Sequence, residues 1–224
     1  MNNYQIKKEN NKIVEMLSEC KKIWVVSDLH LIKYDKESGR VYHAPDYDEK
    51  IDALKQISDG DGVIFLGDLV DSEITDSWLV IKLYRSIIKP RCTTVLIRGN
   101  NDCFEDAFYI DGIGFDAVVY GLLIKDIFMS HTSIPIDGQE QYWNVHGHIH
   151  RYNCDINRIP YYHPCERNVN ICGVCNHIIE FNELQKNIAM LADYNNSWIK
   201  GKTEKPGMSQ FVQNMAIQTF SNLI

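Results

Sequence analysis

The sequence lacks any apolar run that approaches the roughly 20 residues needed to cross a membrane. Its first dozen residues are polar and charged, without the apolar segment of a signal peptide. Basic residues are also not in excess, since 23 Lys and Arg against 30 Asp and Glu give a formal net charge of -7. A dedicated duplex-DNA binder would carry a basic face, so that class is not expected. We therefore expect a cytoplasmic protein that makes no membrane contact.

The cysteines give no sign of a disulfide framework, because their number, seven, is odd and suits reduced thiols. Cys172 and Cys175 have the spacing of half a zinc site, with Cys154, Cys165 and His163 upstream as further candidates. However, the residues around the pair alternate like a strand, and free cysteines often behave as small buried hydrophobes. Packing is therefore the favoured interpretation, and structural zinc is the alternative.

The sequence does contain short apolar runs that alternate with helical patterns. Buried strands are expected at 23–26, 63–66 and 93–97, and helices at 4–19, 48–58 and 76–88. Thr75 or Asp76 is the expected N-cap of the third helix. The order of strand, helix, strand, helix, strand predicts an α/β fold with a parallel sheet.

The second half predicts more strands than helices. A hairpin is expected from 117–120 and 122–129, turning at Gly121, and strand patterns precede His146 and cover 168–181. Asn182 would cap a helix to about Tyr194, with Gln185 closing a capping box. Residues 1–199 are expected to form one domain and 200–224 a linker with a helical tail. That tail would dock on the domain or join copies into an oligomer.

One long polar segment, 32–48, is expected to be a loop, and loops of this length are often functional. It carries candidate groups for holding a phosphate: Lys33, Arg40, Tyr42 and His43. For each of them, a solvated position is the competing interpretation.

Carboxylate, amide and imidazole side chains follow the predicted strands directly. They are Asp28, His30, Asp68, Asn100, His131, His148 and His150. Sites in open α/β sheets form outside the carboxyl ends of the strands, so these residues are expected to converge. Such a mixed set, without a thiolate, suits Mn, Fe, Ni or Zn. Seven ligands are too many for one catalytic metal but suit two that share a carboxylate, an arrangement that clamps phosphoryl oxygens.

Each of these short motifs, taken alone, also has an ordinary structural explanation. Gly67-Asp68 is common turn chemistry, and His146 is expected to pack or to support a ligand rather than to be one. The joint order is what carries the prediction: Asp28-x-His30, Gly67-Asp68, Gly99-Asn100-x-Asp102, His131 and Gly147-His148-x-His150.

This order of blocks resembles the calcineurin-like metallophosphoesterase superfamily, in particular its compact bacterial and phage members. The resemblance covers about residues 20–195. It implies an αββα fold of four layers, in which two mixed sheets pack face to face with helices outside. It also implies a metal-dependent phosphoesterase that acts on a small phosphorylated substrate, with nucleotides among the candidates.

The resemblance further implies a ligand set for two divalent metals, with manganese expected first and Fe, Zn, Ni or Mg as alternatives. Asp28, His30 and His150 would hold the first metal, and Asn100, His131 and His148 the second. Asp68 would bridge both, and a hydroxide between the metals would attack phosphorus. Asp102 would support its neighbours from behind the ligands.

Position 101 departs from the family pattern, in which Gly-Asn-His-Asp is usual and the histidine lies near the leaving group. Here the residue is Asn101, whose amide donates hydrogen bonds but cannot deliver a proton at neutral pH. Small phosphodiesterases of the superfamily also lack this histidine, so the resemblance favours diesters over monoesters.

Three alternatives remain open at this point. One is a phosphomonoesterase of small metabolites or nucleotides, and another is a protein-binding scaffold like the retromer subunit of this fold, whose ligand set has degenerated. A nuclease is less favoured, because the chain is acidic and lacks basic or aromatic tracts for nucleic-acid strands.

Overall fold

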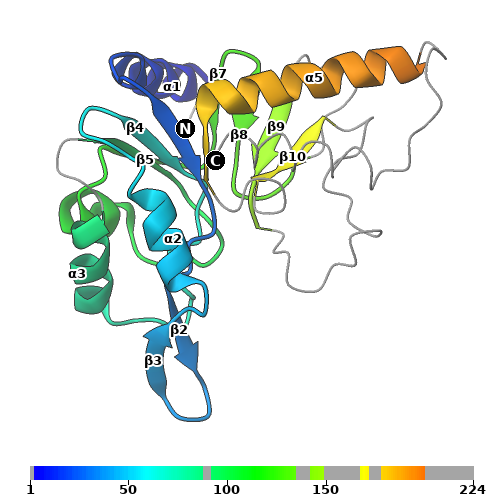
Figure 1. The fold of residues 1–224 in the computed structure, drawn as a ribbon. Coiled ribbons are helices and arrows are strands. Elements are labelled where there is room, and N and C mark those ends of the chain that lie inside the picture. The colour runs from blue at the N-terminus through cyan, green and yellow to red at the C-terminus, as the bar shows by residue number, and fades with distance from the viewer. Residues whose placement is uncertain (1–2, 88–91, 135–141, 149–166, 172–177, 200–224) are drawn as a thin grey trace.

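The computed structural model describes residues 3–87, 92–134, 142–148, 167–171 and 178–199. Its core is a pair of mixed sheets (Figure 1). The five-stranded sheet has the order β11 (Ile178–Glu180), β1 (Ile23–Val26), β4 (Gly62–Phe65), β5 (Thr93–Ile97) and β6 (Ala117–Val119). The four-stranded sheet has the order β10 (Asn168–Asn170), β9 (Trp143–His146), β8 (Ile127–Met129) and β7 (Leu122–Ile124).

Both sheets are mostly parallel. In the first, β1, β4, β5 and β6 run parallel and β11 pairs antiparallel with β1. In the second, β8, β9 and β10 run parallel and β7 pairs antiparallel with β8. The three strands predicted in the first half, and two mixed sheets with flanking helices, are confirmed.

The central strands β1 and β4 of the first sheet carry no polar side chain, because both of their faces are buried. Val25, Ile64 and Val95 pack in one cluster with side chains of the second sheet. Their neighbours Trp24 and Val63 point the other way, into a cluster with α2 and α3. The first sheet therefore lies between the second sheet and a layer of helices.

The helices are α1 (Asn3–Ser18), α2 (Tyr47–Leu54), α3 (Ser77–Ile87), the π-helix η1 (Phe108–Ile113) and α5 (Phe181–Ile199). Side chains of α2, α3 and η1 belong to the outer cluster of the first sheet. Helix α1 contacts β5 in one sheet and β7 in the other, whereas α5 contacts β1 and β11. Both run across the top of the view in Figure 1. Among the described residues, no helix is long and apolar enough to span a membrane.

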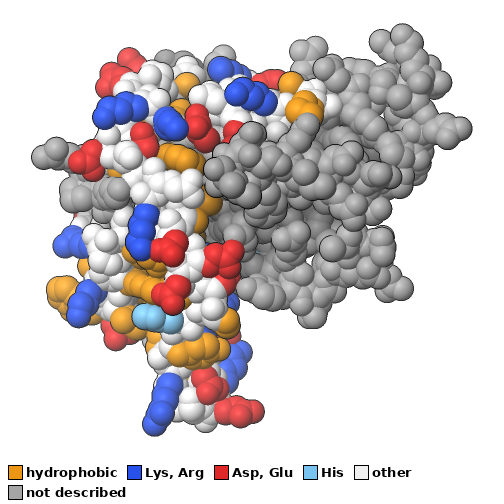
Figure 2. All heavy atoms as spheres, viewed as in Figure 1, with side chains coloured by type: hydrophobic (Ala, Val, Ile, Leu, Met, Phe, Trp, Pro, Cys, Tyr) orange, Lys and Arg blue, Asp and Glu red, His pale blue; other side chains and the backbone are white. Residues whose placement is uncertain are grey.

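The prediction of a loop at 32–48 was wrong, because this segment contains the hairpin of β2 (Ile32–Asp35) and β3 (Arg40–His43). Its turn closes with the Gly39 amide donating to the Asp35 carbonyl at 2.8 Å, and Gly39 has a φ of 67°. Among the described strands, β2 and β3 pair with each other alone, and all four residues of β3 are exposed. A mostly polar sequence hid the hairpin, because Ile32 is the one buried residue among the eight of its two strands. Figure 2 shows acidic and basic side chains interspersed on this face of the molecule.

The hairpin predicted around Gly121 was also wrong. Residues 117–119 pair parallel with β5 as the edge of the first sheet, and the hairpin is formed by β7 and β8 within the second. Gly121 lies where the chain passes between the sheets, and a Cβ there would overlap the ring of Phe128. The apolar pattern is the same for a hairpin and for a crossing between sheets, so sequence alone did not separate them.

Helix boundaries were predicted less well than strands. The Oδ1 atom of Asp76 accepts the amide of Leu79 at 3.1 Å, which confirms this residue as the cap of α3. Helix α2 ends at Leu54 rather than near 58. Asn182 lies inside α5, and its amide donates to Glu180 at 3.2 Å, so it is not the predicted cap. Cys172, Cys175 and the tail at 200–224 lie outside the described residues.

Candidate metal centre

Six of the seven predicted ligands lie in the described part of the chain, and the structure gathers them at the carboxyl ends of β1, β4, β5, β8 and β9. Asp28, His30, Asp68 and His131 are buried, whereas Asn100 and His148 are exposed. His150 lies outside the described residues. The convergence predicted from strand-end positions is therefore seen for these six side chains.

Two groups of potential metal ligands share one carboxylate. Asp28, His30 and Asp68 form the first group, and Asp68, His131 and His148 form the second. Within each group the ligand atoms all lie within 4.8 Å of one another. A shared carboxylate between two clusters of donors is the arrangement that two neighbouring cations require, because they need a common anion.

The two oxygens of Asp68 face different histidines. Oδ1 lies 3.4 Å from Nε2 of His131, and Oδ2 lies 3.4 Å from Nε2 of His30. The left-handed backbone of Asp68, with a φ of 54°, directs the carboxylate between the two groups.

His131 is oriented by a main-chain carbonyl. Its Nδ1 lies 2.7 Å from the Leu66 oxygen, which can only accept, so Nδ1 carries the proton. The other nitrogen, Nε2, lies 3.0 Å from Oδ1 of Asn100 and 3.2 Å from Nδ1 of His148. Three donor atoms thus converge on one point, with the ring of His131 held in the tautomer that a metal needs.

Asp28 links the ends of the two sheets. Its carboxylate accepts the amide of His148, at 3.1 Å to Oδ1 and 2.9 Å to Oδ2, and also contacts the hydroxyl of Ser27. A Cβ at Gly147 would collide with Oδ2 of Asp28, so only glycine allows this approach. Steric crowding therefore explains why the residue before His148 is a glycine.

Asp71 is a residue that the sequence prediction missed. Its Oδ1 lies 2.9 Å from Nδ1 of His30 and accepts a hydrogen bond of 2.9 Å from Nζ of Lys33. Because a carboxylate accepts, Nδ1 of His30 is the protonated nitrogen and Nε2 faces Asp68. The only sequence signal was a second Asp three residues after Asp68.

The stretch from Gly99 to Asp102 wraps around the shared carboxylate. Asp102 accepts three backbone amides, from Asp68 at 2.9 Å, Leu69 at 3.1 Å and Gly99 at 2.7 Å, and so joins the ends of β4 and β5. Asn101 donates to both oxygens of Asp68, from its backbone amide at 2.9 Å and from Nδ2 at 2.6 Å. Its side chain is therefore turned toward the shared carboxylate.

Asp68 and the two histidines beside it, His30 and His131, shift one another's pKa. Burial alone would raise the pKa of Asp68, but hydrogen bonds from His131 and His30 hold that pKa well below its usual range. Burial alone would lower the pKa of each histidine, but the Asp68 carboxylate raises both, with Asp71 adding to the effect on His30. A divalent cation would replace these protons, since a bound metal requires neutral imidazole.

With this geometry in view, comparison with known proteins identifies the family. The sequence profile of calcineurin-like phosphoesterases matches residues 21–198. The chain belongs to this family. No curated protein matches the sequence.

Two solved structures are similar to this calcineurin-like phosphoesterase at low sequence identity. A protein of unknown function from Aquifex aeolicus is 19% identical with a TM-score of 0.47, over 74% of this chain and 98% of the other. The nuclease MPE of Pseudomonas putida is 19% identical with a TM-score of 0.40, over 57% of this chain and 61% of the other.

The phosphoesterase holds its candidate ligands in an uncommon backbone conformation. Among the described non-glycine residues, six have a positive φ, and four of these are Asp28 (51°), His30 (37°), Asp68 (54°) and His148 (68°). Such residues cost about 1–3 kcal/mol each and persist where the surroundings impose them, typically at functional sites. The strain is thus concentrated on the proposed ligands.

Two of the residues between 32 and 48 that were candidates for holding a phosphate contact other side chains instead. Lys33 pairs with Asp71, and the ring of His43 stacks on Tyr47 at a centroid distance of 4.0 Å. His146, predicted to pack, is buried, with Nδ1 lying 2.9 Å from the Gly147 oxygen, and burial lowers its pKa.

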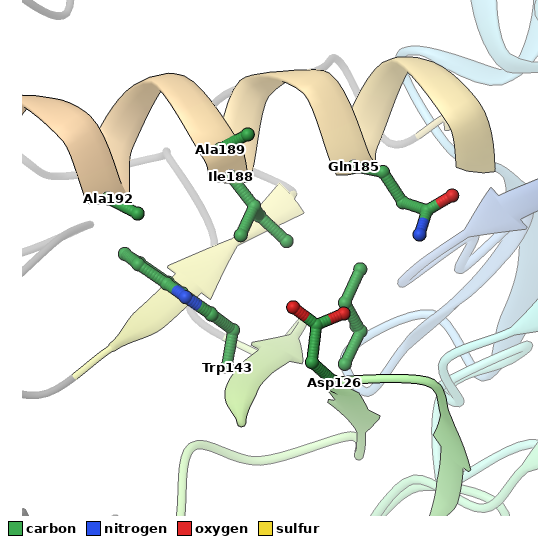
Figure 3. Close-up of a pocket in the computed structure, with 7 residues that line it drawn as sticks. Asp126, Trp143, Gln185, Ile188, Ala189 and Ala192 are labelled. Atoms are coloured by element: carbon green, nitrogen blue, oxygen red, sulfur yellow. The ribbon is translucent and has the colours of Figure 1, made fainter. Parts of the chain in front are cut away.

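A cavity of about 410 Å³ lies between α5 and the amino-terminal ends of β8 and β9 (Figure 3). Trp143 and Ile188 face each other across it, with Asp126 and Gln185 beside them. Because the proposed ligands follow the carboxyl ends of the same strands, this cavity is not part of the metal centre.

Gly99 offers a direct test of how tightly the loops surround Asp68. A Cβ at Gly99 would collide with Oδ1 of Asp68 and lie 2.5 Å from its backbone nitrogen. We expect Gly99→Ala to lower the free energy of unfolding by about 1–3 kcal/mol through overpacking, and to weaken Mn²⁺ binding. Gly112→Ala is the control, since its Cβ would meet only ordinary contacts from 3.4 Å outward. Urea unfolding and Mn²⁺ titration measure both effects; equal behaviour of the two variants would contradict the prediction.

Proposed function

We propose that this calcineurin-like phosphoesterase is a hydrolase that uses two divalent metal ions and favours small phosphodiesters. The observation that supports it most is the place of Asp68 in both groups of potential ligands. In this proposal Asp28, His30 and His150 hold one metal, Asn100, His131 and His148 hold the other, and Asp68 touches both.

The donor chemistry fits such a pair of ions. Carboxylate, amide and imidazole groups suit Mn, Fe, Ni or Zn, with manganese proposed first and Mg kept as an alternative. In both His131 and His30, Nε2 faces the proposed metal site. Each ring is held through its Nδ1, in His131 by the Leu66 carbonyl and in His30 by Asp71. When bound, two such ions supply a deprotonated water as nucleophile and a positive field for the phosphoryl oxygens.

The exposure of the ligands indicates where the substrate enters. Asp28, His30, Asp68 and His131 are buried at the base of the site, whereas Asn100 and His148 are exposed. A phosphoryl group would therefore approach from the second group of ligands. The loops on that side would read the rest of the substrate, for which nucleotides are candidates.

The preference for diesters is proposed from Asn101. An amide cannot protonate a leaving oxygen at neutral pH, and general-acid catalysis is typically worth about 10² to 10⁴-fold. In the structure its Nδ2 also donates to Asp68 rather than to solvent. Monoesters with poor leaving groups are expected to react slowly, in line with the family's small phosphodiesterases that lack this histidine.

The proposal is tested with metal-free protein to which single metals are returned. We expect Mn²⁺ to restore hydrolysis of bis-p-nitrophenyl phosphate at a rate at least about tenfold above that on phenyl phosphate, because phenolate is the poorer leaving group and no acid is present to protonate it. Chelation with EDTA should abolish turnover and lower the melting temperature of the protein, since a bound ligand stabilises the folded state.

Three outcomes would change the proposal. No turnover of either ester or of nucleotides would favour the protein-binding scaffold. Faster hydrolysis of the monoester would overturn the substrate preference but leave the metal centre. Cleavage of single-stranded DNA or RNA at low salt would favour the nuclease alternative.

A further inference from the structure

The turn from Asp28 to His30 is strained and carries two of the proposed ligands. Both residues have a positive φ, 51° and 37°, and Leu29 between them is buried. The end of β4 holds one side of this turn: the amide of Asp28 donates to the Gly67 carbonyl and the amide of His30 to the Asp68 carbonyl, each at 3.1 Å.

The other side of the turn is held by Lys50, which comes from α2. Its Nζ donates to the carbonyl oxygens of Leu29 at 2.6 Å and Asp28 at 3.3 Å, and it pairs with Oδ2 of Asp46 at 3.0 Å. Lys50 is only 7% exposed. A lysine is rarely buried to this extent, because removing its charge from water is costly unless partners compensate.

The two carbonyls that Lys50 contacts belong to consecutive peptide planes. Holding the planes after Asp28 and Leu29 fixes ψ of Asp28, both dihedrals of Leu29 and φ of His30. These are the angles that direct the Asp28 carboxylate and the His30 ring toward Asp68. The carbonyls of Gly67 and Asp68, just after β4, accept from the amides of the turn, and Lys50 donates to its carbonyls.

We infer that Lys50, with Asp46 as its counter-ion, is a positioning residue for the half of the metal centre formed by Asp28 and His30. The inference rests on the proposed function, because it assigns Lys50 to a metal-binding turn. Lys50 does not touch the ligand atoms; it acts through the backbone between them. The second group of ligands should depend on it much less, because His131 is held by the Leu66 carbonyl and His148 meets the turn only through the hydrogen bonds of its amide to the Asp28 carboxylate.

The test compares Lys50→Met with Lys55→Met. Lys55 follows the same helix and also pairs with an aspartate, Asp52, at 2.5 Å, but its side chain is 71% exposed. Because Lys50→Met removes the cation that pairs with the half-buried Asp46, the double variant Lys50→Met/Asp46→Asn is measured as well. Lys50→Arg tests rescue, since Arg keeps the charge and the donors.

The first readout is Mn²⁺ binding by calorimetry. We expect two sites in the parent protein, and in both Lys50→Met variants one site weakened about 10 to 100-fold, the usual effect of removing support behind a metal ligand. The other site should stay within about threefold, and Lys50→Arg should recover part of the loss. Equal weakening of both sites, or of neither, would overturn the inference.

The second readout needs no metal. In the metal-free protein, amide hydrogen exchange of residues 28–31 should be about tenfold faster in Lys50→Met/Asp46→Asn than in Lys55→Met, with exchange of β4 and β5 unchanged. Unchanged exchange at the turn would overturn the positioning role. If the parent protein binds no Mn²⁺ while the turn still loosens, the proposed function fails and the role of Lys50 in the turn stands.

Discussion

Replacing Asp68 by Asn is expected to reduce kcat/KM by more than about 100-fold, because removing even the outer partners of a metal site costs 10 to 100-fold. Asn keeps the shape of the side chain but removes the negative charge that both groups of ligands share. Two divalent cations about 3.5–4 Å apart would then lack their common anion. Mn²⁺ binding should fall from two sites to one at most.

The geometry adds a second reason for this loss. Asp68 accepts from Nδ2 and the backbone amide of Asn101 and faces His30 and His131. An Asn amide in its place would point an NH₂ group at one of these donors. Asp52→Asn is the matched control, since the side chain of Asp52 is 70% exposed. Activity of Asp68→Asn within tenfold of the parent, with the same melting temperature, would remove the shared carboxylate from the proposal.

The sequence predicted which side chains lie together at the strand ends better than it predicted the helices or the connections. Asp28, Asp68 and Asn100 each follow a short apolar run, a pattern typical of a strand buried on both faces. The carboxyl ends of parallel strands meet at one edge, so Asp28, Asp68 and Asn100 were placed together without knowledge of contacts. His131 and His148 were likewise expected to follow strands, and the structure places those strands, β8 and β9, in the second sheet.

What the sequence did not predict depends on contacts between distant segments. Asp71 supports His30 across 41 residues, and Lys50 reaches Leu29 from a helix 21 residues further along the chain. Neither residue has a periodicity that distinguishes it from a solvated charge. The β2–β3 hairpin was missed for a different reason, since only Ile32 of its eight strand residues is buried and its pattern therefore records little burial.

The structure also changes the interpretation of Asn101. From sequence it was a polar group facing the substrate; in the fold both its donors are directed at Asp68. The histidine usual at this position in the family would lose the Nδ2 contact and gain a titratable ring beside the shared carboxylate. One side chain at this position can either donate a hydrogen bond to Asp68, as Asn101 does, or supply a proton, as a histidine would.

Asn101→His is therefore expected to raise monoesterase activity, most of all on substrates with poor leaving groups. Those substrates gain most from a proton donor, typically by about 10² to 10⁴-fold in efficient enzymes, and a tenfold gain on phenyl phosphate would be significant. On p-nitrophenyl phosphate, whose leaving group needs little protonation, the gain should be smaller. The ratio of the two rates measures the new acid independently of metal loading.

Asn101→Ala separates the acid from the lost hydrogen bond. Both variants remove the donation from Nδ2 to Oδ2 of Asp68, while the backbone amide at 2.9 Å remains in place, so both should weaken Mn²⁺ binding to a similar degree. Only the histidine variant should change the ratio of phenyl phosphate to p-nitrophenyl phosphate turnover. If alanine produced the same gain, Asn101 would act by restricting Asp68 or the space above it, and the diester preference could no longer be attributed to a missing acid.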